Sequence, residues 1–273
     1  MTVTEERTSA LPSPLRIGLS RVVPELKMFY RRPEQMIMTF SMPTVICVLL
    51  ASIFSTTPPG SPVGTGAVIA ASMLAYGILS TSFINLGISI ASDRDTGALR
   101  RLRGTPATAT SYFVGKIALV AVVSLAEAVL LLTVGVLFFD LRLPTGMSEW
   151  FTLAWVFVLG IVSCALLGIF VSNLASNAVS AAAITNGPAV GLQFLSGTYV
   201  PLMVLPPWML VVGSIFPVKW MAQGFRSVLL PPEMVVFEPA GSWEHGRTLL
   251  MLTAWSVIGL LCCLRVFRWS DTD

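Results

Sequence analysis

Charged residues are scarce in this sequence. Asp, Glu, Lys and Arg make up 11% of its 273 residues, whereas a soluble domain has about a quarter. The hydrophobic residues, 55% of the chain, gather in long runs bounded by turn and charge clusters, as in membrane-spanning helices. This composition excludes a soluble enzyme, and it also excludes a disordered or fibrous chain.

Residues that bind metals or carry out catalysis are almost missing. The single histidine, His245, has no ligand partners nearby, and we expect it on the surface of an outer loop. The four cysteines lie inside apolar runs without zinc-site spacing, where thiols behave as small hydrophobes. No Ser/His/Asp set converges on one membrane face, so the sequence predicts no catalytic residue and no metal site.

A phosphate-binding loop is missing as well. No segment reads G-x-x-x-x-G-K-[ST], and the closest string, Gly115-Lys116-Ile117, lacks the upstream glycine and the hydroxyl residue. The first 35 residues or so form the longest expected cytoplasmic segment, which is too short for an ATPase. They also lack the order of a signal peptide, so we expect the first span to stay attached as an anchor.

Six runs have the length of about 20 residues that a helix needs to cross a membrane. We expect these spans at 36–54, 67–91, 117–139, 151–171, 178–200 and 247–265. The predicted fold is therefore an all-α membrane protein, with a flexible tail at 1–14 and a transmembrane domain at 34–268.

The segment 15–33 is amphipathic. Arg16, Glu25 and Arg32 lie on one side of the expected helix, which Pro24 interrupts. The opposite side carries apolar residues at helical spacing, namely Leu15, Leu19, Val22, Leu26 and Phe29. Such a basic amphipathic helix typically lies in the membrane interface; an ordinary solvated helix is the alternative.

The stretch 201–230 is apolar but fits no span. Pro206 and Pro207 break a helix, and neither half is long enough to cross alone. We predict two short helices that form a re-entrant hairpin on the outer side, with a seventh span as the alternative. Six spans place most of the 17 Lys and Arg on the side of both termini, which the positive-inside rule makes cytoplasmic. A seventh span would spoil this asymmetry.

A short loop rich in charge, residues 92–106, follows the second span. It contains Asp93-Arg94-Asp95-Thr96-Gly97-Ala98-Leu99-Arg100-Arg101-Leu102 and ends at Gly104-Thr105-Pro106. An acid at its start can cap a helical turn whose dipole favours bases at the end. Leu99 and Leu102 offer an apolar edge to a partner. A solvated loop with positive-inside arginines is the alternative.

This loop resembles the first cytoplasmic loop of ABC-2 type transporter permeases, where an acid–basic–acid run leads through Gly and Leu to Arg-Leu and Thr-Pro. A second segment is similar to the family's Ser-Gly-x-x-x-Pro segment and outward hairpin; it contains Ser196, Gly197, Pro201, Pro206, Trp208, Pro217 and Arg226. The one departure is Asp93, where many members carry Glu. The most similar subgroup is the daunorubicin-resistance-type drug exporters of high-GC bacteria.

The resemblance implies a permease subunit of an ABC exporter in the bacterial cell membrane. The coupling residues that would dock on a separate ATPase are Asp93, Arg94, Asp95, Gly97, Leu99, Arg100, Arg101 and Leu102. Two ATPase copies would bind ATP and Mg, and this chain would hold no cofactor and no nucleic acid. A second permease copy or a paralogue, surrounded by membrane lipid, would complete the path.

The expected substrate is an amphipathic drug, antibiotic or lipid-like molecule that enters from the bilayer. A glycolipid or polysaccharide exporter has the same plan and is the alternative. A membrane-embedded lipid-modifying enzyme would need more acids near the cytoplasmic interface than Asp93 and Asp95. A non-transporting scaffold would carry a larger outer domain.

Polar residues inside the spans are candidates for the substrate path. A carboxylate such as Glu127 costs about 2.5 kcal/mol or more at mid-span, so it should face the bundle interior or a cavity. It could contact a cationic substrate, relay a proton, or form a hydrogen bond to a neighbouring helix as the neutral acid.

Two further sets of polar residues share a helix face. These are Thr81, Asn85 and Ser89 in the second span, and Asn186 and Gln193 in the fifth. They could line a substrate surface between two protomers or form interhelical hydrogen bonds. Gly187 and Gly191, four residues apart, predict a close helix approach, with a kink at Pro188.

Overall fold

The computed structural model describes residues 16, 18, 20–57, 60–103 and 109–266, and this part of the chain is helical and contains no strand. The long helices are α3 (Pro33–Ile53), α4 (Thr65–Ile78), α5 (Leu86–Asp95), α7 (Ala109–Phe139), α8 (Met147–Ser172), α9 (Ala178–Leu195) and α12 (His245–Val266). The short ones are α2 (Val22–Tyr30), η1 (Leu79–Asn85), α6 (Ala98–Arg103), η2 (Leu202–Val204), α10 (Pro207–Ile215), α11 (Pro217–Leu229) and η3 (Pro232–Phe237). The all-α prediction is confirmed.

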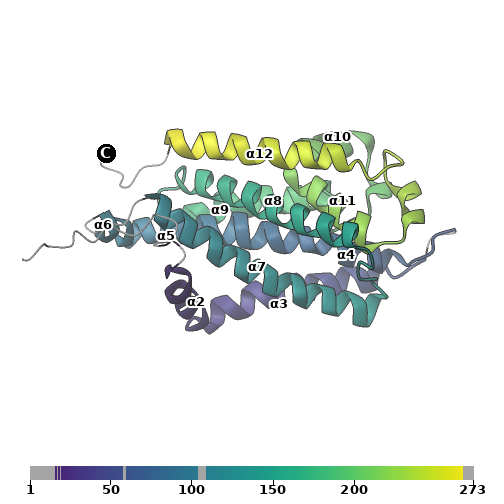
Figure 1. The fold of residues 1–273 in the computed structure, drawn as a ribbon, viewed down its shortest axis with the longest axis horizontal. Helices are drawn as coiled ribbons and strands as arrows, with labels where there is room; N and C mark the ends of the chain where they lie inside the picture. Colours follow the sequence, from purple (N-terminus) through teal and green to yellow (C-terminus); the bar gives the residue numbers. More distant parts are fainter. Residues whose placement is uncertain (1–15, 17, 19, 58–59, 104–108, 267–273) are drawn as a thin grey trace, which may run out of the picture.

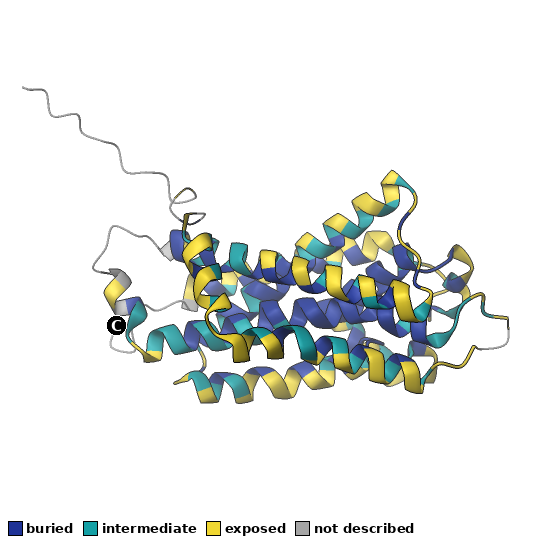
Figure 2. Ribbon diagram, turned by 90° about the horizontal axis from the view of Figure 1, so that it is seen from below, coloured by how far each residue is buried: buried dark blue, intermediate teal, exposed yellow. Residues whose placement is uncertain are grey.

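The long helices run side by side along the longest axis of the molecule (Figure 1). α2, α6 and the C-terminal end of α12 lie at one end of this bundle, and α10, α11 and η3 lie toward the other. α4, η1 and α5 form one continuous helix through the centre, packed against α3, α7, α8, α9 and α11. Figure 2 shows the buried residues concentrated there, while the outer helices expose one side.

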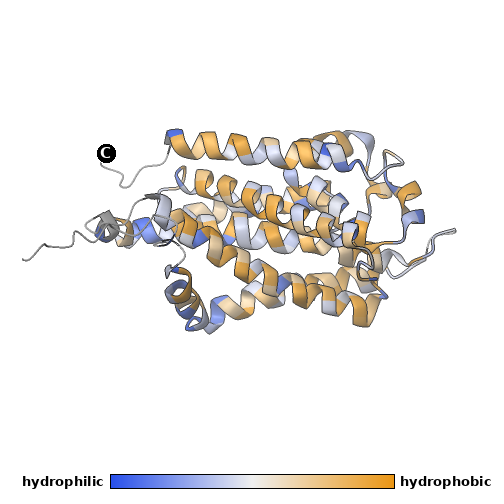
Figure 3. Ribbon diagram, in the orientation of Figure 1, coloured by the Kyte–Doolittle hydropathy of each residue, from blue (hydrophilic) through white to orange (hydrophobic). Residues whose placement is uncertain are grey.

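Five helical segments among the described residues are long and apolar enough to cross a membrane. They are Pro33–Ile53, Thr65–Asp95, Thr110–Phe139, Met147–Ser172 and His245–Arg265, and Figure 3 shows their hydrophobic colouring along the bundle. The sixth expected span, 178–200, corresponds to α9, which ends at Leu195. Polar Asn186 and Gln193 make α9 less apolar, so a sixth crossing stays a prediction.

The N-terminal helix differs from its expected pattern. Leu15 and Leu19 lie outside the described residues, and α2 begins at Val22. The helical segment is interrupted by a turn at Arg21, just before Pro24. Pro24 itself lies in the first turn of α2, where its missing N–H has no intrahelical partner. Glu25, expected on the solvated side, is only 8% exposed because it forms an ion pair with Lys116 of α7.

The central helix contains a π-helical segment, η1, a rare geometry that is frequent at functional sites. η1 packs against α8, where Gly168 provides the space. A Cβ atom on Gly168 would lie 2.8 Å from the carbonyl oxygens of both Ser82 and Phe83. Backbone atoms of two packed helices cannot move aside as a flexible side chain can, so the η1–α8 contact requires glycine.

We therefore expect Gly168→Ala to lower the free energy of unfolding by about 1 to 3 kcal/mol, as overpacking does. The matched control is Gly187→Ala, because a Cβ there meets nothing within 4 Å and helical alanine is favoured over glycine by about 1 kcal/mol. Unfolding of both variants in detergent would measure the difference. Equal stability of the two variants would contradict the η1–α8 packing.

Candidate functional site

The charged loop after the central helix is attached to the rest of the bundle by a buried ion cluster. Lys116 Nζ of α7 lies 2.9 Å from Asp93 Oδ2 and 3.2 Å from Glu25 Oε2. It also donates a hydrogen bond to Ser89 Oγ at 3.1 Å, and Tyr112 Oη donates one to Asp93 Oδ2 at 2.7 Å. The cluster therefore joins α2, α5 and α7 at the end of the bundle that carries α6.

Arg94, the next residue, connects the loop with the end of α8 and the turn that follows it. Arg94 donates hydrogen bonds to the backbone oxygens of Ser172 and Ala175, in the turn between α8 and α9. Gly97 then takes a left-handed backbone conformation, φ +70°, which L-amino acids with a Cβ disfavour. The chain thus ends α5 and turns directly into α6.

α6 has a buried side and an exposed side. Asp95, the last residue of α5, and Arg101 of α6 are exposed and available to a partner. Leu99, which we expected to offer an apolar edge to a partner, is 1% exposed and belongs to the core. This corrects the expectation for Leu99: α6 folds back on the bundle, so the residue packs inward. The side chains of Arg100 and Leu102, and residues Thr105 and Pro106, lie outside the described part.

The polar face predicted at Thr81, Asn85 and Ser89 lines a cavity inside one chain. The cavity has a volume of about 50 Å³ and lies between α2, α3, η1, α5 and α7. Its other polar lining residues are Gln35, Thr39 and Lys116. These three predicted residues therefore share a face, as expected, and α3 and α7 of the same chain cover it.

Glu127 of α7 lies further along the same interface. It is 1% exposed, and neither carboxyl oxygen has a hydrogen-bond partner among the described residues. This bears out the expectation that Glu127 faces the bundle interior. It does not show the hydrogen bond to a neighbouring helix that we considered for the neutral acid.

The two polar residues of α9 that were expected to share a face differ in burial. Gln193 is buried, with its Oε1 unpartnered among the described residues, whereas Asn186 is exposed and donates to Ala182 O at 2.8 Å. A Cβ on Gly187 or Gly191 would meet nothing within 4 Å. The small-residue pair is therefore not packed against another helix in the described part of the chain.

The second motif forms a compact turn followed by two short helices. Ser196 Oγ and Thr198 Oγ1 are hydrogen-bonded at 2.7 Å, and Gly197 has φ +78°. Pro201 precedes η2, and Pro206 is the N-cap of α10. Pro217 begins α11 at a position where proline is tolerated.

The two short helices differ in burial. Trp208 of α10 is 61% exposed, whereas nearly every residue of α11 is buried, including Arg226. The structure thus contains the two helices predicted for 201–230, and their re-entrant placement in a membrane stays a prediction.

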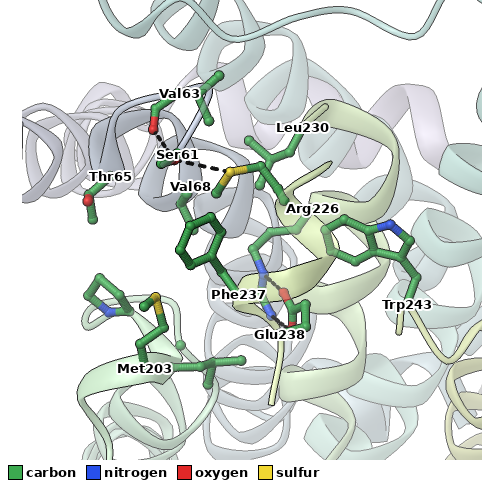
Figure 4. Close-up of a pocket in the computed structure, with 14 residues that line it drawn as sticks. Ser61, Val63, Thr65, Val68, Met203, Arg226, Leu230, Phe237, Glu238 and Trp243 are labelled. Atoms are coloured by element: carbon green, nitrogen blue, oxygen red, sulfur yellow. Dashed lines mark hydrogen bonds and ion pairs between the residues drawn. The ribbon is translucent and has the colours of Figure 1, made fainter. Parts of the chain in front are cut away.

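Arg226 forms a buried ion pair that connects three elements. Its Nε lies 2.6 Å from Glu238 Oε1 and its Nη2 lies 3.1 Å from Glu238 Oε2, while Nη1 donates to Ser72 Oγ of α4 at 3.0 Å. The pair lies in the wall of a cavity of about 40 Å³, near Phe237 and Trp243 (Figure 4). One guanidinium therefore attaches α11 to the central helix and to the segment after η3.

A second cation, Lys219, lies on the same helix. Its Nζ is 3.8 Å from Glu244 Oε2 and 3.6 Å from the centre of the Trp220 ring. Burial lowers the pKa of Lys219 to about 8, although Glu244 and Glu238 act in the opposite direction. Both cations of α11 are thus matched by acids from the segment between η3 and α12.

Several of these residues have no signal in the sequence. The sequence alone assigns no ion partner to Lys116 or Glu25 and does not single out Glu238. Lys116 pairs with Glu25, 91 residues away in the sequence. His245 is exposed, as predicted, and its Nε2 lies 2.9 Å from Ser227 Oγ. No group of three or more His, Cys, Asp or Glu among the described residues could hold a metal ion.

The comparisons with known proteins agree with the motifs. A family model for the ABC-2 type transporter matches residues 22–230, which extend from the start of α2 to the end of α11 and include the charged loop, Glu127 and the two short helices. A search of curated proteins finds no significant match. Since the family model covers most of the 273 residues, the chain belongs to the ABC-2 type transporter family.

Proposed function

We propose that this chain is the permease subunit of an ABC exporter and that α6 is the surface on which a separate ATPase docks. The observation that carries the proposal is that some residues of the motif bind within the chain while others are exposed to a partner. Asp93 and Arg94 bind other parts of the bundle, while Asp95 and Arg101 are exposed. A partner that moves α6 would thus act directly on the bundle.

The contacts of Asp93 and Arg94, which precede α6, indicate how a movement of α6 would reach the rest of the bundle. Asp93 connects the loop with α7 and α2 through Lys116, and Arg94 connects it with the α8–α9 turn. ATP and Mg would be bound by two copies of the ATPase, whose closure would displace α6 and, through these contacts, the spans. Transport then requires that the substrate's affinity differ between the two arrangements.

The path itself is proposed to lie between two permease copies or at the lipid-facing surface. The two cavities that hold the polar face and the Arg226 pair have volumes of about 50 and 40 Å³, whereas drug-sized ligands need about 300 Å³ or more. A larger hollow of about 720 Å³ lies in the loop region after α3 and α7 and includes none of the polar residues of the predicted path. The exposed face of α9 with Gly187 and Gly191 suits close approach of a second copy or a paralogue. We favour an amphipathic drug, antibiotic or lipid-like substrate; a glycolipid or polysaccharide is the alternative.

The proposed location is the bacterial cell membrane, with both termini in the cytoplasm. α2, α6 and the end of α12 lie at one end of the bundle, and this end carries most of the basic residues of the sequence. The positive-inside rule assigns such an end to the cytoplasm. ATP is then available on the side where α6 lies.

Co-purification from the native host tests the docking surface. We expect a Walker-motif ATPase to co-purify with the wild type, and its recovery to fall at least about fivefold with Arg101→Glu, equivalent to about 1 kcal/mol of binding. Arg142→Glu is the matched control, because Arg142 is also exposed but follows the C-terminal end of α7 and lies near the segment after α3, whereas the loop before α6 contacts Lys116 near the N-terminal end of α7. Absence of an ATPase under mild conditions, or equal recovery with both variants, would contradict the proposal.

A further inference from the structure

The buried carboxyl group of Glu127 has an unusual environment. The Glu127 side chain packs against the backbone of Gly77 of α4, which has no side chain of its own. A Cβ atom on Gly77 would lie 3.0 Å from both Cδ and Oε1 of Glu127. Neither oxygen has a hydrogen-bond partner among the described residues. An ionised carboxylate needs partners when it is taken out of water, so the packing seen here suits the neutral acid.

Among the residues that the structure describes, the helices next to Glu127 place no compensating charge beside it. Tyr76 of α4 is the titratable side chain that interacts electrostatically with Glu127. Residues 36–53 of α3 and 150–172 of α8 contain only the thiols of Cys47 and Cys164, and η1 contains no titratable residue. On α7 the nearest charge is Lys116, three turns toward the α6 end, which pairs with Glu25 of α2 and Asp93 of α5.

Hydroxyl and amide groups continue from Glu127 toward that end. Ser124, one turn before Glu127 on α7, is hydrogen-bonded to Thr81 of η1, and Thr81 Oγ1 donates to Gly77 O at 2.9 Å. Thr81 also lines the cavity of about 50 Å³ together with Asn85, Ser89 and Lys116. That volume can hold more than one water molecule, which needs about 15 Å³ and polar partners. Ser124, Thr81 and this cavity are called the polar track below.

We infer that Glu127 is a proton-binding site and that the polar track connects it with the end of the molecule that carries α6. In the structure described here the carboxyl holds its proton. When α7 and η1 separate enough for water to reach it from the cavity, the O–H bond breaks, the proton passes to a water molecule to give a hydronium ion, and the carboxylate is hydrated. The track passes beside η1, whose π-helical geometry is frequent at functional sites.

The inference does not rest on the proposed transport function, because its readout is the carboxyl group itself. Wild type and Glu127→Gln would be placed in lipid vesicles, and their infrared difference spectrum recorded at a series of pH values. We expect a protonated-carboxyl band at neutral pH that is present in the wild type and missing from the variant. It should decline as the pH rises toward about 9, the upper range documented for buried glutamates.

Proton exchange with deuterated buffer tests the polar track. Thr81→Val with Ser124→Ala removes both hydroxyl groups of the polar track, and we expect it to slow the deuterium shift of the Glu127 band at least fivefold. Ser163→Ala is the matched control: it removes a buried serine hydroxyl of α8 that donates to Gly160 O and does not line the cavity, and it should leave the rate unchanged.

A third measurement needs no variant. Dicyclohexylcarbodiimide adds to protonated carboxyl groups in apolar surroundings, and mass spectrometry locates the adduct. We expect modification of Glu127 in the wild type at neutral pH and at least tenfold less at high pH. Absence of both the infrared band and the adduct would overturn the proton site, and an exchange rate unaffected by the Thr81/Ser124 variant would overturn the track.

Discussion

Replacing Lys116 by methionine is expected to lower the free energy of unfolding by about 3 kcal/mol, the lower end of the range for removing one partner of a buried ion pair. Lys116 is 5% exposed, and methionine keeps much of its packing volume. The charge, however, is what Glu25 and Asp93 require, at 3.2 and 2.9 Å. The lower end of the range applies because the Asp93 side chain is 29% exposed and water can partly hydrate it.

Denaturation in mixed micelles would measure the loss of unfolding free energy in Lys116→Met. Lys27→Met provides the matched control, since Lys27 is an exposed lysine of α2 and should change stability by no more than about 0.5 kcal/mol. Adding Glu25→Gln to Lys116→Met should restore part of the loss, because it removes one of the two carboxylates left unpaired. If Lys116→Met and Lys27→Met were equally stable, the cluster would not hold α2, α5 and α7 together.

Replacing Arg226 by methionine is expected to lower the free energy of unfolding by about 3 to 5 kcal/mol, because Glu238 would be left buried without its partner. The pair is less exposed than the Lys116 cluster: the side chains of Arg226 and Glu238 are 3% and 6% exposed. Arg226→Lys should recover only part of the loss, since an ammonium group cannot reproduce the two parallel bonds to Glu238 together with the bond to Ser72.

Arg247 pairs with Glu244, whose side chain is only 9% exposed and also lies 3.8 Å from Lys219, and Arg247 provides the control for this prediction. Arg247 has a 72% exposed side chain, so Arg247→Met should cost no more than about 1 kcal/mol. In unfolding measurements, the double variant Arg226→Met, Glu238→Leu should be more stable than Arg226→Met alone, because it leaves no unpaired charge. A loss with Arg226→Met no larger than that with Arg247→Met would show that α11 is held by apolar packing alone.

The sequence was sufficient for the helices because a membrane span satisfies its backbone hydrogen bonds within itself. A run of apolar residues therefore fixes a helix locally, and the expected spans agree with the observed helices within a few residues at most ends. The largest difference is at the start of α7. α7 begins at Ala109, eight residues before the expected start, because Lys116 finds partners inside the bundle and does not mark its boundary.

Through a family motif, the sequence singled out residues of the charged loop as candidates for coupling, but it did not indicate what each of them contacts. Asp93 and Arg94 bind within the chain, Leu99 is buried, and Asp95 and Arg101 remain exposed. A motif records which residue types occur together. It cannot say which of them face a partner, because that depends on how α6 folds back on the bundle.

By itself, the sequence determined the helical fold, the breaks at the prolines of 201–230 and the family, since each depends on local patterns. Only the tertiary structure decided the ion partners of Lys116 and Arg226, the π-helical segment packed at Gly168 and the unpaired state of Glu127. Lys116 meets Glu25 across 91 residues, and Arg226 meets Ser72 across 154. Such contacts arise when helices pack, and pairs so far apart leave no periodicity in a single sequence from which they could be predicted.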